Sequence, residues 1–469
     1  MFVGRERELS ELDRLASRDT FQMAVVYGRR RVGKTALISK FVENRPCLFY
    51  TAQQKSDALN LRVFSRDVYR FFGLPEDAGA FQDWSAGLSF VAQRARELPG
   101  FVFVFDEFPY AAQANPSLPS ALQIAIDHGF QETGTFLILC GSNEGFMESE
   151  VLGAKSPLYG RRTAQLKLGP LGYRDAANLV PSDDVEELIT YYAVFGGTPY
   201  YLRQIDPAAS FVENMARQFF SISGVLYAEP QMLLRQELRD PALYSSVLDA
   251  IGSGETTPKR IAERAGVEEN SVGSYLKILM DLGIAERVLP FDAPARGSRK
   301  SIYRIADPFF AFWYRFVSPQ VDMIEAGLGE IAAQFAEGET LTTYVGRQFE
   351  SVCLQWLVEQ AREQRLPFVP MKFGTWWGPD PVVREQTDID VVVANRREGK
   401  VLAGECKWRN SFDETEALRA LEHRASLLTD YSDRYLVLFS KRAVSEGTRE
   451  KVAADERLTL VTAQDLYRV

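Results

Sequence analysis

Three short apolar runs in the N-terminal third of the chain have the pattern of buried strands. They place β-branched and aromatic residues next to one another without regular polar alternation, and each leads directly into glycine or polar residues. The runs comprise residues 23–27, 101–105 and 136–141. Uninterrupted apolar strands are typical of a parallel sheet that helices cover on both faces. The pattern therefore predicts an α/β domain.

A glycine-bounded loop follows the first run, and an amphipathic helix is expected over 36–42. The loop, residues 28–35, has the sequence G-x-x-x-x-G-K-T. Its backbone N–H groups and the helix dipole can hold a phosphate, Lys34 adds a positive charge, and Thr35 offers a hydroxyl to Mg²⁺. We therefore expect ATP here, with Lys34 also acting in catalysis. The nucleotide-binding residues predicted for the loop are Gly28, Arg29, Arg30, Arg31, Val32, Gly33, Lys34, Thr35 and Ala36.

Polar residues at the ends of the other two runs predict the remaining groups for hydrolysis. Asp106 is expected to hold Mg²⁺ through water, and Glu107 to act as general base toward the attacking water. The alternative is that both acids cap the segment that follows. Asn143 or Ser142 is expected to sense the γ-phosphate at the carboxyl end of a neighbouring strand, unless this is an ordinary turn. The three loop arginines are expected to be solvated or paired with acids, without a catalytic role.

The middle of the chain has the pattern of a winged helix. Helices are expected over 244–251, 258–265 and 270–282, and strands over 283–288 and 303–305. The hairpin tip carries Arg296, Arg299 and Lys300, whereas Glu268 and Glu269 precede the helix that would enter a DNA groove. We therefore expect any contact with DNA to be weak and salt-sensitive, and to be made through phosphates. The alternatives are base readout through Asn270 and Ser271, and a role in packing or as a lid.

An aromatic run occupies residues 309–317, directly after the predicted hairpin. Such a run can form a surface on which bases stack, or a buried helix that joins two domains. Large aromatic side chains bury extensive apolar surface, so we expect the buried helix.

The C-terminal region carries a second group of chemistry-bearing residues. Strands are expected over 387–393 and 401–407, joined by a tight turn. Because strand side chains alternate, Asp388 and Asp390 share one face, as do Glu405 and Lys407. A helix starting at 344 can bring Glu350 to them. Clustered carboxylates repel one another unless a cation is present, so Asp390 and Glu405 are predicted ligands of Mg²⁺ or Mn²⁺, with Glu350 and Lys407 assisting catalysis. The alternative is a solvated strand.

Composition narrows the class of protein. A chain of 469 residues corresponds to about three domains. Four well-separated cysteines and two histidines argue against a disulfide framework, a zinc site and histidine catalysis. The net charge of −9 gives no global signal for nucleic acid. Apolar runs are too short for a membrane span and the first residues are charged, so we expect a cytoplasmic protein with no membrane contact.

Motifs spread over the first 202 residues resemble those of archaeal-type AAA ATPases. They occupy residues 2–9, 28–35, 106–107, 139–142, 157–162 and 196–202. The resemblance implies Val3, Gly4 and Arg5 near the adenine, Arg161 and Arg162 as an arginine finger or sensor, and Gly197 and Pro199 on the lid side of the nucleotide. The Asp390 and Glu405-Cys406-Lys407 pattern resembles PD-(D/E)XK nucleases, and members of the same ATPase family often carry such a domain.

The expected fold is therefore a multidomain α/β protein. It comprises a P-loop AAA-type ATPase core with a parallel sheet over 1–170, a helical lid over 171–238, a winged helix over 239–318 and a restriction-endonuclease-like domain over 319–469. The function predicted is ATP hydrolysis coupled to a metal-dependent, nuclease-like domain that acts on DNA. The alternative is a nucleotide-gated regulatory or scaffold protein whose nuclease-like domain binds without cleaving. Oligomerisation stays open.

Overall fold

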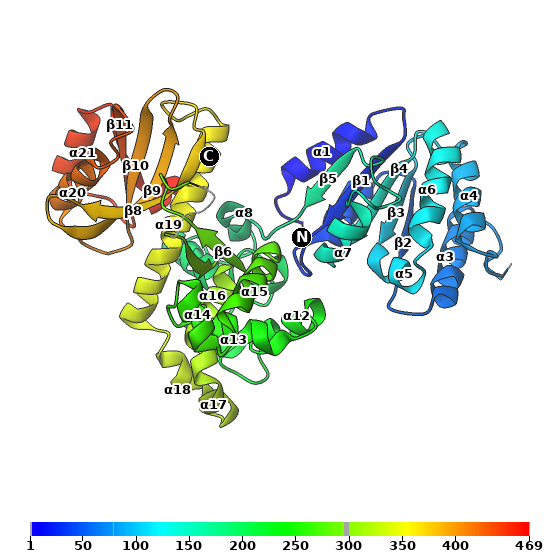
Figure 1. Ribbon diagram of the computed structural model, residues 1–469, viewed down its shortest axis with the longest axis horizontal. Coiled ribbons are helices and arrows are strands. Elements are labelled where there is room, and N and C mark those ends of the chain that lie inside the picture. The colour runs from blue at the N-terminus through cyan, green and yellow to red at the C-terminus, as the bar shows by residue number, and fades with distance from the viewer. Residues whose placement is uncertain (1, 78, 295–299, 469) are drawn as a thin grey trace. The chain divides into compact units, whose positions relative to one another are not determined.

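The computed structural model describes residues 2–77, 79–294 and 300–468, and these fall into two compact units (Figure 1). The first unit comprises Met1–Pro170 and Thr198–Tyr200. The second comprises Leu171–Gly197 and Tyr201–Val469. Two of the basic residues expected at the hairpin tip, Arg296 and Arg299, lie outside the described residues.

The first unit is built on a five-stranded parallel sheet with the order β2-β3-β4-β1-β5. Its strands are β1 (Gln22–Tyr27), β2 (Cys47–Thr51), β3 (Val102–Asp106), β4 (Phe136–Gly141) and β5 (Ala164–Lys167). The three apolar runs form β1, β3 and β4 at the centre of this sheet, where every residue is buried. The prediction of a P-loop type parallel sheet is confirmed.

Helices cover both faces of this sheet (Figure 1). They are α1 (Glu6–Ala16), α2 (Lys34–Val42), α3 (Asp57–Phe71), α4 (Trp84–Ala95), α5 (Phe108–Ala114), α6 (Leu118–His128) and α7 (Glu144–Phe146). Successive residues of β1 point to opposite faces: Ala24 and Val26 pack with α1 and α2, whereas Met23 and Val25 pack with α3 to α6. Burial on both faces is the reason that these strands show no polar alternation.

The second unit begins with a helical region that leads to a short hairpin. Its helices are α8 (Tyr173–Ala177), α9 (Val185–Phe195), α10 (Pro199–Leu202, whose first two residues belong to the first unit), α11 (Phe211–Phe219), α12 (Glu229–Glu237), α13 (Pro241–Gly252), α14 (Pro258–Ala265) and α15 (Glu269–Asp281). The antiparallel strands β6 (Ala285–Val288) and β7 (Ile302–Ile305) follow. The predicted order of three helices and a hairpin is present, and its interpretation as a winged helix stays a prediction.

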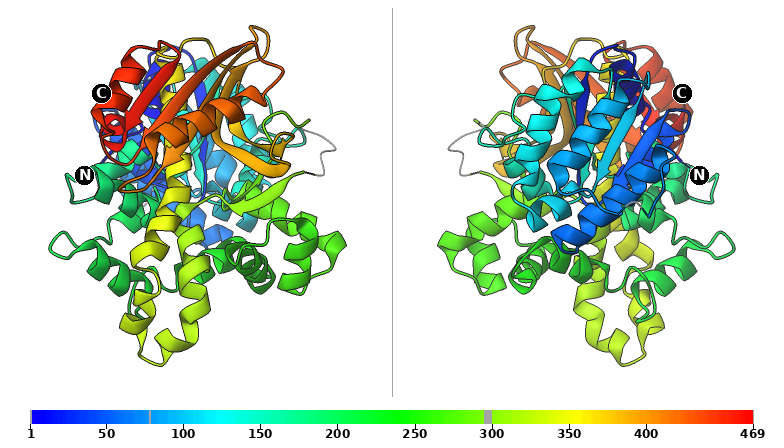
Figure 2. Two further views of the ribbon diagram at one scale, coloured as in Figure 1. Left: turned by 90° about the vertical axis from the view of Figure 1, so that its left-hand side faces the viewer. Right: turned by 90° about the vertical axis from the view of Figure 1, so that its right-hand side faces the viewer.

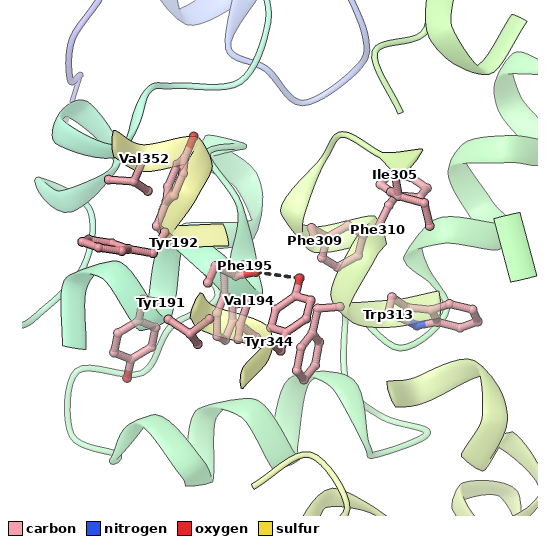
Figure 3. Close-up of a cluster of buried hydrophobic side chains, with 14 of the residues drawn as sticks. Tyr191, Tyr192, Val194, Phe195, Ile305, Phe309, Phe310, Trp313, Tyr344 and Val352 are labelled. Carbon is pink, nitrogen blue, oxygen red and sulfur yellow. Dashed lines mark hydrogen bonds between the residues drawn. The ribbon is translucent and has the colours of Figure 1, made fainter. Parts of the chain in front are cut away.

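The aromatic run is buried, as expected. It forms α16 (Pro308–Phe312) and the π-helical segment η3 (Trp313–Val317). Asp307 caps α16 by accepting a hydrogen bond from the Phe309 N–H at 2.9 Å. The hydroxyl of Tyr344, a residue of the cluster drawn in Figure 3, shares its hydrogen between the carbonyl oxygens of Ala193 at 3.0 Å and Pro308 at 2.9 Å. The run therefore joins α9 to the long helix that follows, and it does not form a base-stacking surface.

A mixed five-stranded sheet ends the second unit, with the order β12-β11-β10-β9-β8. Its elements are α17 (Val321–Glu325), α18 (Gly329–Gln334), α19 (Gly338–Arg362), β8 (Lys372–Asp380), β9 (Glu385–Asn395), β10 (Lys400–Lys407), α20 (Glu414–Ser426), β11 (Asp433–Ser440), α21 (Glu446–Ala453), β12 (Leu458–Thr462) and α22 (Ala463–Tyr467). The expected hairpin is confirmed as the antiparallel pair β9 and β10. Helix α19 packs on one face of the sheet and α20 on the other, and Figure 2 shows α19 running from the helical region to the sheet.

Helix α19 spans 25 residues, yet its exposed side is polar. Neither α19 nor any other helix among the described residues is long and apolar enough to cross a lipid bilayer.

Gly404 tests how tightly the C-terminal sheet is packed. A Cβ atom at this position would lie 2.4 Å from Val391 Cγ2 and 2.8 Å from Val437 Cγ1, and valine side chains have little freedom to move. We expect Gly404→Ala to destabilise the protein by about 1–3 kcal/mol, measured as a lower midpoint of thermal or urea unfolding. Gly447→Ala is the control, because nothing lies within 4 Å of that position. Equal midpoints for the two variants would contradict this packing.

Candidate functional site

The phosphate loop connects the end of β1 to the start of α2. Gly28 and Gly33 have φ values of 147° and 96°, and Gly33 is the N-cap of α2. A Cβ atom on Gly28 would lie 2.2 Å from the carbonyl oxygen of Leu168. Only glycine fits there, because both the backbone conformation and the close approach exclude a side chain.

Lys34 is buried inside this loop. Its Nζ donates hydrogen bonds to the carbonyl oxygens of Gly28 at 2.7 Å and Arg29 at 3.0 Å. The ammonium group is thus held by backbone oxygens at the N-terminus of α2, which itself favours an anion. A phosphate oxygen placed in the loop would meet both the charge and the helix end.

Thr35 and Asp106 supply oxygen atoms beside the loop. The Thr35 Oγ1 lies 3.3 Å from Asp106 Oδ2, and Asp106 is buried at the end of β3. A hydroxyl and a carboxylate are the kind of ligands that Mg²⁺ accepts, directly or through water. The donor set therefore fits Mg²⁺ bound together with a nucleotide.

Glu107 is held by the neighbouring strand. It has a positive φ of 49°, and its Oε2 accepts hydrogen bonds from the Ser142 hydroxyl at 2.9 Å and the Ser142 N–H at 3.4 Å. The side chain of Asn143 instead caps α7, accepting a hydrogen bond from the Phe146 N–H at 2.9 Å. Of the two predicted sensor residues, Ser142 is the one that contacts the predicted general base.

The three loop arginines contact three different groups. Arg29 is buried, and its Nη2 donates to Thr198 Oγ1 at 3.2 Å. Arg30 bonds the Tyr110 hydroxyl. The guanidinium carbon of Arg31 lies 4.4 Å from the centre of the Tyr200 ring, a cation–π contact. Two of the three arginines thus contact the segment 198–200.

Residues implied by the resemblance to lie around the nucleotide fall into two groups. In the N-terminal group of Val3, Gly4 and Arg5, Arg5 bonds the carbonyls of Val32 at 3.1 Å and Gly169 at 2.5 Å. In the lid group, Pro199 Cγ lies 3.8 Å from the position a Cβ would take on Gly33, whereas Gly197 belongs to the second unit. The adenine contacts themselves stay predictions.

Arg161 and Arg162 lie at the amino ends of the strands of the first sheet, whereas the phosphate loop lies at their carboxyl ends. They precede β5 beside the start of β1, where the Thr163 N–H donates to the Met23 carbonyl at 2.8 Å. The six residues of β1 span roughly 20 Å between these two ends. Arg161 forms a two-pronged ion pair with Asp127, at 2.8 and 2.5 Å. Neither arginine therefore reaches the loop of its own chain, and the finger role stays a prediction that requires a second copy.

In the second unit, the hairpin and α19 bring the four predicted acid-site residues together. Asp390 Oδ2 accepts a hydrogen bond from the Cys406 N–H at 2.7 Å. Glu405 is buried, and its two oxygens accept hydrogen bonds from Lys407 at 2.5 Å and Arg424 at 2.6 Å. The pKa of Asp390 is raised, mainly by burial and next by the charge of Glu405. The pKa of Glu350 is also raised, mainly by burial and next by the charge of Asp390.

This acid cluster differs from the expected metal site. Within the described part of the chain, no three His, Cys, Asp or Glu side chains are arranged so that they could hold a metal ion. Both oxygens of Glu405 are occupied by cationic side chains, one of them Arg424 of α20. Because its charge is already balanced, the donor set as arranged does not fit Mg²⁺ or Mn²⁺.

Several residues that pair with the predicted site residues carry no signal in the sequence. Arg424 is far from the acid pattern and lies on a helix without a motif. Thr198 and Tyr200 belong to a predicted motif, but nothing in the sequence links them to the arginines of the loop. The side-chain pairing across β3 and β4, between Glu107 and Ser142, is visible only once the strands are known to be neighbours.

Comparisons with known proteins support the interpretation of this loop as the site of an ATPase. A family described as an ATPase domain predominantly from Archaea matches residues 2–205, and one described as archaeal and bacterial proteins of unknown function matches residues 313–419. The uncharacterized protein MJECL04 of Methanocaldococcus jannaschii is 32% identical over 445 residues, which cover 94% of this chain and 96% of that protein. The chain belongs to this family of archaeal-type ATPases. It binds ATP and hydrolyses it.

Two solved structures have partly similar folds. The Walker-type ATPase of Pyrococcus abyssi has 18% identity and a TM-score of 0.48, and the match covers 67% of this chain and 96% of that one. The ORC2 protein of Aeropyrum pernix has 15% identity and a TM-score of 0.41, covering 70% and 95%.

Lys34→Ala removes the ammonium group from the phosphate loop of this ATPase. We expect ATP turnover to fall by about 10²-fold or more, because charge that develops on the phosphates loses its main partner. The measurement is release of inorganic phosphate by the purified full-length chain. Lys40→Ala, on the exposed side of the same helix, is the matched control and should keep the wild-type rate. Undiminished turnover in Lys34→Ala would exclude the loop as the hydrolytic site.

Asp390→Asn tests whether ionisation of the Asp390 carboxyl destabilises the folded protein. Because the pKa of Asp390 is raised in the folded protein, its ionisation disfavours folding at high pH and has no effect at low pH, where the carboxyl is protonated in both states. We expect Asn to stabilise the protein at pH 8 on the order of 1–2 kcal/mol and to leave it unchanged below about pH 3, where the carboxyl is protonated in both states. Thermal unfolding measures this, with the exposed Asp183→Asn as control, because the charge of Asp388 itself raises the pKa of Asp390. Destabilisation at pH 8 would show instead that the carboxylate is held by a favourable ion pair.

Proposed function

We propose that this ATPase is a nucleotide-driven switch whose second unit binds a partner without cleaving it. ATP binding and hydrolysis at the phosphate loop supply the two states of the switch. The observation that favours binding over cleavage is the pairing of both Glu405 oxygens with Lys407 and Arg424. A hydrolytic metal site needs that carboxylate open toward an ion.

The chain's own residues account for the ATP reaction. Lys34 leaves the loop carbonyls to hold the phosphates, and Glu107, steadied by Ser142, accepts a proton from the attacking water. Thr35 and Asp106 would hold Mg²⁺, which supplies neutralising charge at the phosphates. In the conformation described here Glu107 is bonded to Ser142, so that hydrogen bond must adjust when water is activated.

DNA is the partner that the helical region supports best. Helices α13 to α15 and the hairpin of β6 and β7 have the element order of a winged helix. The candidate reading helix α15 starts with Glu269 directly after Glu268, and two acids at a helix start oppose phosphate approach. We therefore propose weak, salt-sensitive contact through the DNA backbone, without readout of base sequence.

A metal-dependent nuclease is the second candidate. The raised pKa values of Asp390 and Glu350 favour it, because acids whose charges repel one another are typical of a site that a cation completes. In this case Glu405 would have to exchange Arg424 for the ion. The cluster would then match the PD-(D/E)XK arrangement.

Incubation of linear and plasmid DNA with ATP and Mg²⁺ or Mn²⁺ separates the two candidates. We expect the wild-type chain to leave the DNA intact, because Glu405 is already paired. If cleavage occurs and is lost in Glu405→Gln but kept in Lys34→Ala, the nuclease replaces the binding module. Cleavage that persists in both variants comes from a contaminant. DNA affinity measured with ADP and with a non-hydrolysable ATP analogue should differ; equal affinities would contradict the switch.

A further inference from the structure

The chain passes between its two units three times: after Pro170, after Gly197 and after Tyr200. In the first unit, the segments at these passages all contact the phosphate loop. Gly28 packs directly against the carbonyl of Leu168, and Arg5 connects the carbonyl of Val32 in the loop to that of Gly169. The third segment, residues 198–200, is here called the loop clasp.

Each residue of the loop clasp meets a different residue of the phosphate loop. Thr198 is 1% exposed and accepts a hydrogen bond from Arg29. Pro199 packs against Gly33, and the ring of Tyr200 lies under the guanidinium of Arg31.

The residues on both sides of the clasp are held in the second unit. Tyr201 is fully buried, its hydroxyl donates to Glu229 at 3.0 Å, and its ring centre lies 4.3 Å from that of Phe309. On the other side, the carbonyl of Gly197 accepts a hydrogen bond from the Leu171 N–H at 2.8 Å. The short helix α10 therefore has its first two residues on the phosphate loop and its last two in the core of the second unit.

The contacts that hold the clasp involve the same groups that a phosphate engages. Lys34 bonds the carbonyls of Gly28 and Arg29, and Arg29 in turn holds Thr198. When Lys34 binds a phosphate instead, the carbonyls of Gly28 and Arg29 lose the hydrogen bonds that its ammonium group donates to them. A guanidinium also binds phosphate more strongly than it binds a partly exposed aromatic ring.

We propose that the loop clasp reports the occupancy of the phosphate loop: nucleotide phosphates draw Arg31 from Tyr200 and weaken the hold of Arg29 on Thr198, so the clasp loosens. Because α10 continues into the core of the second unit, loosening is passed on through one turn of helix. Thr198 and Tyr200 are positioning residues in this scheme. The inference rests on the proposed switch and names the contacts that operate it.

Hydrogen–deuterium exchange of the full-length chain tests the clasp directly. With AMP-PNP and Mg²⁺, we expect peptides covering residues 196–204 to exchange faster by about 3-fold or more than without nucleotide. Tyr200→Leu, which removes the ring, should exchange fast already without nucleotide. Tyr200→Phe keeps the ring face and should behave like the wild type. Thr198→Val, which keeps the shape but not the acceptor, should show an intermediate rate.

Affinity gives an independent readout that a merely structural role would not produce. If Tyr200 competes with phosphate for Arg31, Tyr200→Leu should bind AMP-PNP about 2- to 5-fold more tightly, with KM for ATP lowered and kcat changed by less than about 2-fold. Weaker binding in this variant would overturn the competition.

The outcomes separate this inference from the switch itself. If nucleotide binds and changes DNA affinity but leaves exchange of residues 196–204 unchanged, the clasp is wrong and the switch stands. If nucleotide speeds exchange there while DNA affinity is unchanged, the clasp stands and the DNA-binding switch is wrong. A chain that binds no nucleotide overturns both.

Discussion

The function of the first unit depends on the buried ammonium group of Lys34, which the backbone of the phosphate loop holds in place. Lys34 has no space for a full shell of water, so the carbonyls of Gly28 and Arg29 take the place of solvent. Those carbonyls can face inward only because glycine allows the loop its unusual backbone and its approach to Leu168. The parallel sheet puts the loop at the carboxyl end of β1, between β4 and β5, and so fixes where this charge lies.

The sequence predicted this part of the molecule well because each signal was local. An apolar strand, the glycine-bounded loop and a helix start occur within 20 residues, and their backbone geometry follows from residue type. The same holds for the hairpin of β9 and β10. Because side chains alternate along a strand, the sequence predicts which face of the sheet Asp390 and Glu405 lie on. The order of strands in the first sheet and the packing of α19 and α20 on opposite faces depend on distant pairing, which no local pattern fixes.

Two site predictions changed because a motif fixes neither the partners of a side chain nor its place along a strand. A pattern of acids fixes where carboxylates lie but not which cations from other elements neutralise them. Arg424 reaches Glu405 from α20, and that one ion pair turns a predicted metal ligand into a balanced buried charge. Arg161 was expected near the nucleotide, yet its position before β5 places it at the amino ends of the strands, where it pairs with Asp127. Strand direction, rather than motif, decides that distance.

The loop arginines connect these observations. Three consecutive cations lie beside the phosphate site, and their contacts include neutral groups: the hydroxyls of Thr198 and Tyr110 and the ring of Tyr200. Contacts with neutral partners hold a cation less strongly than a carboxylate does, so a phosphate can displace them. The cation–π contact between Arg31 and Tyr200 is therefore one that the proposed switch can break and remake in each cycle of binding and hydrolysis.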